Sequence, residues 1–366
     1  MNKSVTGMSC RIVLVVIFCL VVSNEVFSWS MAALPDTGQT IVSTETFGED
    51  SDYDFNPPDF TDHDNGTVTD NVTGLIWQKG ESGTTTTWDD AVIFCADLTL
   101  GESEDWRLPS AHELFSIVNH DTAKPPLDSA YFTSSTEAEY WWSNTVPAFG
   151  SSKVWVVNSG GGIGAHPKTE ASSKAHYVRC VRGTPGNEMS FSGNGNGTVT
   201  DNNTGLMWEQ DGNSPPTDWE GGLQYCEGLN LANHDDWRLP NVKELRSINN
   251  DDYDSPSIDD QYFKSPNNTA EYWTSTSNRN HNTQAWYMTL EWGIVSHIEK
   301  TESYYSRCVR NAEEDPLAEA LADVIRSLQV ITGMTPSGVT VGDDINGDFR
   351  IGLEEAIGSL KEVLDL

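Results

Sequence analysis

Near its C-terminal end the chain carries oxygen-bearing side chains at a spacing that suits a divalent cation. Asp344, Asn346 and Asp348 occupy positions 1, 3 and 5 of a twelve-residue stretch that ends on Glu355. The backbone carbonyl of Arg350 would add a ligand at position 7, and Glu355 would bind through both carboxylate oxygens. This is the ligand pattern of a calcium-binding loop between two helices. We therefore expect calcium as a cofactor here, with a solvated acidic turn as the alternative.

Two similar apolar stretches place this loop within a helical unit. Leu321–Leu328 is echoed 32 residues later by Leu353–Leu360, and both stretches have a helical pattern. Phe349 stands where such loops normally carry Gly for a sharp turn, and this weakens the expected affinity. The stretch 315–366 resembles a dockerin-like or EF-hand helix pair. No second loop precedes its first helix, so it is not a complete two-loop dockerin.

Four cysteines beyond residue 32 could bind a metal, act as nucleophiles or form disulfides. They are Cys95, Cys180, Cys226 and Cys308. The sequence has no Cys-x-x-Cys motif, and no His stands beside these cysteines at equivalent positions, which argues against zinc and against a reactive thiol. Disulfides are the expected state in an exported protein, and four cysteines allow three pairings.

The chain repeats itself at an offset of 131 residues. Asn65–Asn71 recurs as Asn196–Asn202, and Asp105–Pro109 recurs as Asp236–Pro240. Matches of this length at one offset indicate two homologous modules. The expected plan is a leader at 1–32, an extension at 33–54, modules at 55–183 and 191–311 joined by a linker at 184–190, and the helical unit at 315–366.

The match continues beyond Phe132, but with a drift in register. Glu139–Trp141 corresponds to Glu271–Trp273, and Arg179–Arg182 corresponds to Arg307–Arg310. Each copy then holds one early and one late cysteine. Because homologous modules should close in the same way, we expect one disulfide within each copy, Cys95 with Cys180 and Cys226 with Cys308.

Each copy predicts a short series of elements. Alternating residues around an Asn-Gly pair predict a hairpin, and a helix follows at Trp88–Cys95 or Trp219–Cys226. The Trp-Arg-Leu-Pro segment leads into a second helix at Ala111–Val118 or Val242–Ile248. The rest of each copy is strand-rich, and its closing strand carries the late cysteine. The fold class expected is α+β.

The first hairpin also resembles a calcium loop, because Asp62 and Asp64 precede its Asn-Gly pair. The second copy has Gly193 and Gly195 at these positions. Since one of the two copies lacks these ligands, we interpret the stretch as a turn.

Charge and the first residues indicate where the protein works. The 366 residues include 55 Asp and Glu against 21 Lys and Arg, a net charge of −34, which disfavours nucleic acid and anionic membranes as partners. Lys3 and Arg11 precede the apolar run Ile12–Val22, and small residues follow. This layout predicts a cleaved signal peptide, with a retained anchor as the alternative, and the run is short for a membrane span. We expect an exported protein, extracellular, at the cell surface or periplasmic.

The order of motifs in each copy resembles the Lcl C-terminal-domain family of bacterial exported or surface modules. The motifs are Asn-Gly-Thr-Val-Thr-Asp, Thr-Gly-Leu, a helix with Cys, Trp-Arg-Leu-Pro and Arg-Cys-Val-Arg. The resemblance implies a C-type-lectin-like fold, in which an early helix is disulfide-bonded to the last strand. It also implies adhesin-like binding of a glycan or protein. Sulfated glycans, which the namesake binds, are disfavoured here by the net charge.

Aromatic residues are the candidates for a ligand surface. With 13 Trp in the chain, most are expected in the core. If an exposed platform exists, its candidates are Tyr140, Trp141, Trp142, Tyr272 and Trp273. We interpret Arg107 and Arg238 of the Trp-Arg-Leu-Pro segments as braces that hold loops through carboxylates.

The residues favour a binding protein over an enzyme. Trp-Arg-Leu-Pro before a Glu-bearing helix also occurs in formylglycine-generating enzymes, which need a reactive Cys pair. Here each module has two cysteines, and both are expected in one disulfide. The alternatives are an enzyme on that scaffold and a purely structural envelope protein.

Overall fold

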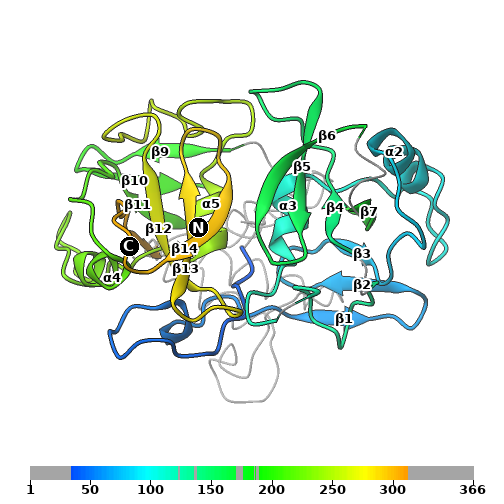
Figure 1. The fold of residues 1–366 in the computed structure, drawn as a ribbon, viewed down its shortest axis with the longest axis horizontal. Helices are drawn as coiled ribbons and strands as arrows, with labels where there is room; N and C mark the ends of the chain where they lie inside the picture. The colour runs from blue at the N-terminus through cyan, green and yellow to red at the C-terminus, as the bar shows by residue number, and fades with distance from the viewer. Residues whose placement is uncertain are drawn as a thin grey trace, which may run out of the picture.

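The computed structural model describes residues 34–122, 124–135, 138–169, 176–184, 186 and 189–311. Two similar halves stand side by side, module 1 with α2 and α3 and module 2 with α4 and α5 (Figure 1). The predicted leader at 1–32 and the calcium loop within 315–366 lie outside the described residues.

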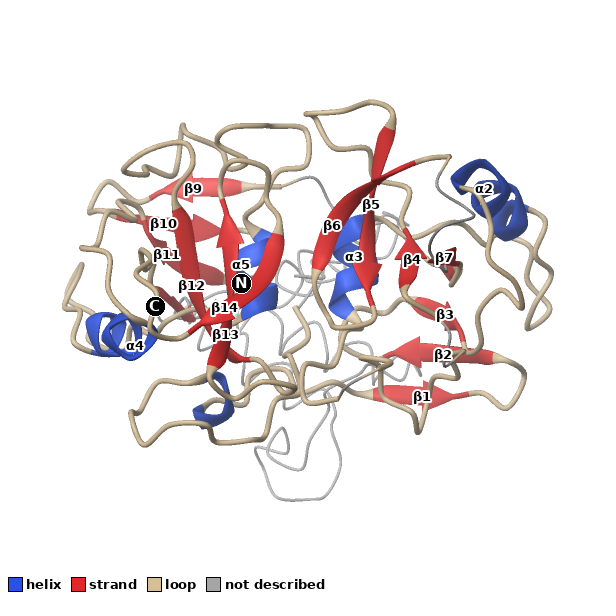
Figure 2. Ribbon diagram, in the orientation of Figure 1, coloured by secondary structure: helices blue, strands red, loops and turns tan. Residues whose placement is uncertain are grey.

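Strands make up most of the regular structure in both modules (Figure 2). In module 1 the elements are β1 (Phe60–Asp62), β2 (Thr67–Asp70), β3 (Ile76–Gln78), α2 (Trp88–Ala96), α3 (Ala111–Ser116), β4 (Tyr140–Trp142), β5 (Lys153–Asn158), β6 (Ile163–Pro167), β7 (His176–Tyr177) and β8 (Val181–Arg182). In module 2 they are β9 (Phe191–Gly193), β10 (Thr198–Asp201), β11 (Leu206–Glu209), α4 (Trp219–Glu227), α5 (Val242–Ser247), β12 (Glu271–Ser277), β13 (Gln284–Thr289), β14 (Val295–Glu299) and β15 (Val309–Asn311). A 3-10 turn, η1 (Asp50–Asp52), precedes both modules.

The Asn-Gly hairpin predicted at the start of each module is present. β1 pairs antiparallel with β2, and β9 pairs antiparallel with β10. Asp64 adopts a φ of 56°, and its N–H donates to the Asp62 carboxylate, which also pairs with Lys79. The Asp62 carboxylate and the Asp64 backbone therefore take part in turn geometry, as the comparison with Gly193 and Gly195 indicated.

Each hairpin belongs to a small four-stranded sheet, β1-β2-β3-β8 or β15-β11-β10-β9. The two helices of each module begin at side-chain caps. Thr87 caps α2, and Ser110 forms a capping box with Glu113 at the start of α3. Asn241 and Glu244 repeat the box in α5. The second helices are shorter than predicted, because the chain leaves helical hydrogen bonding after Ser116 and Ser247.

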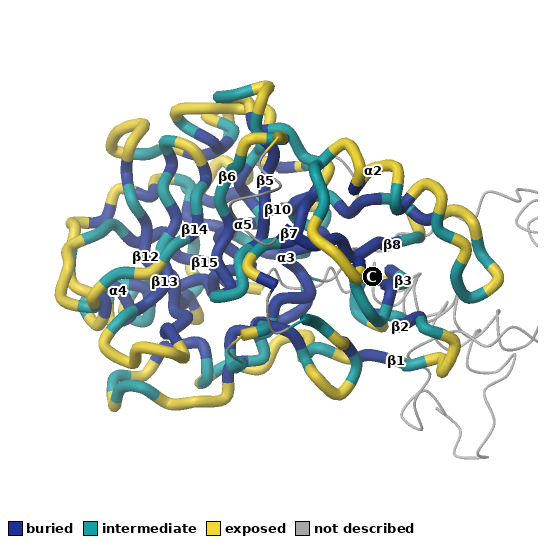
Figure 3. Tube along the Cα trace, turned by 45° about the vertical axis from the view of Figure 1, so that its right-hand side comes forward, coloured by how far each residue is buried: buried dark blue, intermediate teal, exposed yellow. Residues whose placement is uncertain are grey.

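A third sheet joins the two modules. Its order is β12-β13-β14-β6-β5-β4-β7, seven strands drawn from both modules. The modules meet where β14 pairs antiparallel with β6 through Val295 and Ile163. Helices α3 and α5 pack against this sheet, and one hydrophobic cluster includes apolar residues of both modules. Buried positions gather in these strands and helices, and exposed positions lie in the outer loops (Figure 3).

Both predicted disulfides are confirmed. Cys95 bonds Cys180 with 5.5 Å between their Cα atoms, and Cys226 bonds Cys308 with 5.4 Å. Each bond ties the first helix of a module to the residue just before its last strand. Trp106 and Trp237 lie in the two hydrophobic clusters around these bonds.

The predicted register drift at Glu139–Trp141 is wrong. Trp142 donates from its indole N–H to the carbonyl of Thr86, and Trp273 donates in the same way to Thr217. The structural partners are therefore still 131 residues apart at β4 and β12. The shared letters Glu-Tyr-Trp suggested a shift of one, but equivalent positions are decided by what each side chain contacts.

The other predicted correspondence, Arg179 with Arg307, is confirmed by geometry. Both guanidinium groups are buried and donate to consecutive backbone carbonyls, Gln78 and Lys79 for Arg179 and Glu209 and Gln210 for Arg307. Each arginine thereby fastens the last strand of its module to the loop after its third strand.

Candidate functional site

The aromatic residues proposed for a ligand platform are mostly core. Trp141, Trp142, Tyr272 and Trp273 are at most 2% exposed, so the expectation that they form a surface is wrong for these four. Only Tyr140 is partly exposed, and its ring packs against two histidines. The alternative interpretation of the aromatics as core holds here, because β4 and β12 turn these rings onto the helices and loops of their modules.

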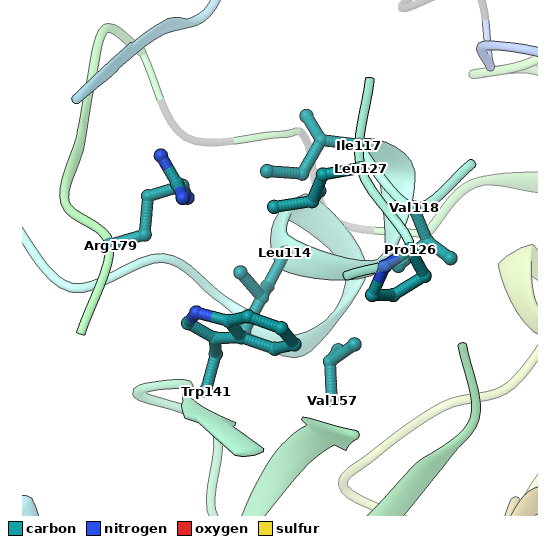
Figure 4. Close-up of a pocket in the computed structure, with 8 residues that line it drawn as sticks. All are labelled: Leu114, Ile117, Val118, Pro126, Leu127, Trp141, Val157 and Arg179. Atoms are coloured by element: carbon teal, nitrogen blue, oxygen red, sulfur yellow. The ribbon is translucent and has the colours of Figure 1, made fainter. Parts of the chain in front are cut away.

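Figure 4 shows how Trp141 lies within module 1. Its indole and Val157 extend from the sheet towards Leu114 and Ile117 of the α3 region. The cavity between them measures about 10 Å³, which is room for about one water molecule. It is a packing gap and holds no ligand of useful size.

A different surface is formed by residues 34–55, here named the N-terminal segment. Although it precedes module 1 in sequence, it packs beneath module 2, where Figure 1 shows it in dark blue. Gln39 exchanges two hydrogen bonds with the backbone of Ser277, at 2.8 and 2.9 Å. Lys243 donates at 2.6 Å to the carbonyl of Asp36. These contacts fasten the segment to module 2, and a backbone hydrogen bond from His120 to the Thr37 carbonyl fastens it to module 1 as well.

Buried acidic groups fasten the segment. Asp50 accepts hydrogen bonds from the hydroxyls of Thr37 at 2.8 Å and Thr276 at 2.6 Å. Burial, with the nearby Asp36 carboxylate, raises the pKa of Asp50 to about 8. Burial and the charge of Glu244 raise the pKa of Asp36 to about 6. At neutral pH Asp50 is therefore largely protonated in the folded protein.

The segment and module 2 together enclose an open cleft of about 460 Å³, within the usual size range of small-ligand sites. Its lining residues are Phe47, Tyr53, Phe55, Glu227, Asp236, Trp237, Arg238 and Asn311.

One wall of the cleft is aromatic. The Tyr53 ring lies 5.7 Å from Phe47 and 5.7 Å from Phe55, and it stacks with the latter. Phe47 is 60% exposed and Phe55 is 37% exposed. Exposed rings gathered in this way are typical of a binding surface. The signal in the sequence is three aromatic residues, Phe47, Tyr53 and Phe55, within an otherwise polar and acidic stretch.

The opposite wall carries charge. The Arg238 guanidinium lies 4.7 Å from the Phe55 ring centroid and 5.4 Å from that of Tyr53. Both of its terminal nitrogens donate at 2.6 Å to Glu244, so its charge is matched.

Two carboxylates complete the wall. Glu227 accepts from the Tyr53 hydroxyl at 2.5 Å, and burial raises the pKa of this carboxyl. Asp236 pairs with Arg310 at 2.7 Å and remains 57% exposed.

The two Trp-Arg-Leu-Pro arginines are the structural braces that the sequence predicted. Arg107 forms a two-armed bridge to Glu113, as Arg238 does to Glu244. The arginine side chain is 26% exposed in module 1 and 4% exposed in module 2. The N-terminal segment explains the difference, because its rings cover Arg238.

Within the described residues, no helix is long and apolar enough to span a membrane. No group of three or more His, Cys, Asp or Glu side chains in that part of the chain is arranged to hold a metal.

Comparison with known proteins accounts for both modules. No curated protein matches the chain as a relative. The model of the Lcl C-terminal domain matches residues 66–182 and again residues 197–310, which together make up more than half of the sequence. The second strand of each hairpin, the helix-to-last-strand disulfide and the arginine brace lie within these two matches. The chain therefore belongs to the Lcl C-terminal domain family, of which it carries two tandem copies.

Proposed function

We propose that this protein is an exported binding protein, without enzymatic activity, that holds a glycan or protein ligand in the cleft between its N-terminal segment and module 2. The observation that carries the proposal is the group of exposed rings, Phe47 and Phe55 with Tyr53 between them, above polar side chains. The family points to a bacterial surface-associated module. The two disulfides fit an extracellular protein.

The finer parts of the proposal rest on the sequence. The disulfide between an early helix and the segment before the last strand supports a C-type-lectin-like fold for each module. Calcium bound at Asp344, Asn346, Asp348, Arg350 and Glu355 would stabilise the tail. The net charge of −34 disfavours nucleic acid and sulfated glycans as ligands.

Binding arrays of glycans and of proteins, each probed with and without calcium, test the proposal. A ligand should be found, and it should be lost in the double variant Phe47→Ala/Phe55→Ala. Val42→Ala is the matched control, since Val42 is 65% exposed on the same segment and does not line the cleft. Absence of binding under every condition would favour a structural envelope protein instead.

The enzyme alternative has its own test. A formylglycine-generating-enzyme-like activity needs a reactive thiol, so titration of free thiols in the unreduced protein distinguishes the two. Oxidation of all four cysteines would rule out that enzyme class, and a reactive thiol would support it.

A further inference from the structure

The hydrogen-bonding character of the cleft limits what it can bind. Its charged donor is Arg238, and both terminal nitrogens of this side chain already donate hydrogen bonds to Glu244. The Tyr53 hydroxyl donates to Glu227. The acceptors are more accessible, because Glu227 is only half-buried and Asp236 is 57% exposed. The cleft is therefore rich in acceptors and poor in free donors.

Glu227 is the carboxylate most in need of a partner. It accepts from a neutral phenol, and within the described residues it forms no ion pair. Asp236, by contrast, is matched by Arg310. The cation that acts on Glu227 is Arg238, which is already paired with Glu244, and a partly buried carboxylate without an ion pair of its own favours a positively charged ligand.

The aromatic wall favours the same chemistry. Ring faces attract cations, and the inner side of the Tyr53 and Phe55 pair already holds one, the Arg238 guanidinium. Phe47 and Phe55 are still 60% and 37% exposed. The excess of 55 acidic over 21 basic residues would draw a basic partner towards the molecule from a distance.

We propose that this cleft receives a Lys or Arg side chain of a basic protein partner, held by the Phe47 and Phe55 rings with Glu227 as its counter-ion. The inference rests on the proposed binding function and selects its protein ligand over its glycan ligand. A neutral sugar is disfavoured because each hydroxyl both donates and accepts, and the cleft has few donors to offer its oxygens.

The test uses the full oxidised chain and small monovalent probes, so that a polycation cannot bind through general charge. The probes are Nα-acetyl-arginine amide and Nα-acetyl-lysine amide, with Nα-acetyl-norleucine amide as the uncharged control and a methyl glucoside as the neutral sugar. Binding is measured by chemical-shift titration. We expect the two cations to bind and the two neutral probes not to bind.

The variants locate the site. Glu227→Gln keeps an acceptor for Tyr53 but removes the charge, and Phe47→Ala/Phe55→Ala removes the rings. Each should weaken cation binding about twofold to fivefold, from the usual size of an exposed cation–π contact or a single charge pair. Asp54→Asn is the matched control, because it removes one negative charge from the same segment at an exposed position that does not line the cleft. Its affinity should equal that of the unmodified chain.

The outcomes separate this inference from the proposed function. Equal weakening by Glu227→Gln and Asp54→Asn would overturn the cation site, because the attraction would then be general. Binding of the glucoside, lost with the rings and unchanged by Glu227→Gln, would overturn the cation site and leave the binding function standing. If no probe binds, and a ligand found on the arrays binds Phe47→Ala/Phe55→Ala as well as it binds the unmodified chain, the cleft is neither a cation site nor the ligand site of the proposed function.

Discussion

The carboxylate of Asp50 accepts a hydrogen bond of 2.6 Å from the hydroxyl of Thr276, a residue 226 positions further along the chain. This contact joins η1 to β12, within the sheet that both modules share. It helps to hold the N-terminal segment, which supplies the aromatic wall of the cleft, against module 2. The segment also contacts module 1, where the backbone N–H of His120 donates to the Thr37 carbonyl.

This attachment should depend on pH. An unfolded Asp has a pKa of about 4, whereas that of Asp50 is raised to about 8 in the folded protein. Between these values the folded state binds the extra proton, so the contribution of Asp50 to the free energy of unfolding should fall as pH rises from about 4 to about 8. Asp36 adds to the fall up to about pH 6.

Asp50→Asn should reduce this slope, because an amide keeps an acceptor for Thr276 and does not ionise. The measurement is the melting temperature from pH 5 to pH 8 for the unmodified chain, for Asp50→Asn and for the exposed control Asp54→Asn. Facing charges on Glu244 and Lys243 are the same in all three. An equal slope in all three proteins would contradict the assignment.

Each disulfide should stabilise the folded protein substantially. The bonds close loops of 85 and 82 positions, and loss of a native disulfide from a small exported domain usually costs about 2–5 kcal/mol. The double variants Cys95→Ser/Cys180→Ser and Cys226→Ser/Cys308→Ser should each lower the midpoint of urea unfolding. An unchanged midpoint in either would show that the bond is not formed in solution.

The two arginine braces should differ in their contribution to stability. Arg238→Ala leaves Glu244 buried without its partner, which costs about 3–5 kcal/mol for a well-buried pair. Arg107→Ala should cost less, because its side chain is 26% exposed and water can replace part of the bridge. Urea unfolding of the two variants is a matched comparison between modules. An equal loss of unfolding free energy in the two variants would mean that burial of Arg238 by the N-terminal segment does not strengthen its bridge to Glu244.

The two modules should unfold together. Trp286 of module 2 packs edge-on against the buried His120 of module 1, with 5.3 Å between ring centroids. Val295 and Ile163 join the sheet across the same boundary. We expect one calorimetric transition for both modules. Trp286→Ala should lower the free energy of unfolding by about 3–5 kcal/mol and so shift the whole transition to lower temperature. Two separate transitions, of which Trp286→Ala shifts the temperature of only one, would contradict a shared core.

The tail should bind calcium. Asp344→Ala and Glu355→Ala each remove a ligand from the predicted loop and should abolish the calorimetric heat of calcium binding. Glu354→Ala is the control, since it removes the same charge at a position that supplies no ligand. Absence of calcium heat in the unmodified chain would remove this site.

Features that depend on local pattern or on the internal repeat were accessible from the sequence. The Asn-Gly hairpins and the helix caps are local, and two copies of one module can close in the same way only through Cys95–Cys180 and Cys226–Cys308. The brace of Arg107 to Glu113 spans six positions, and so it too follows from short-range spacing.

The tertiary structure alone decided which surfaces meet. Trp141 and Trp273 have the composition of a platform, but both faces of β4 and β12 are covered at these positions, and the rings are buried. Phe47 precedes module 1 and Phe55 is its first residue, and yet both form a cleft with module 2, because Asp50 and Gln39 find hydrogen-bonding partners there. Such pairing depends on the shape and burial of surfaces that are far apart in the chain, and the spacing of residues along the sequence does not predict either property.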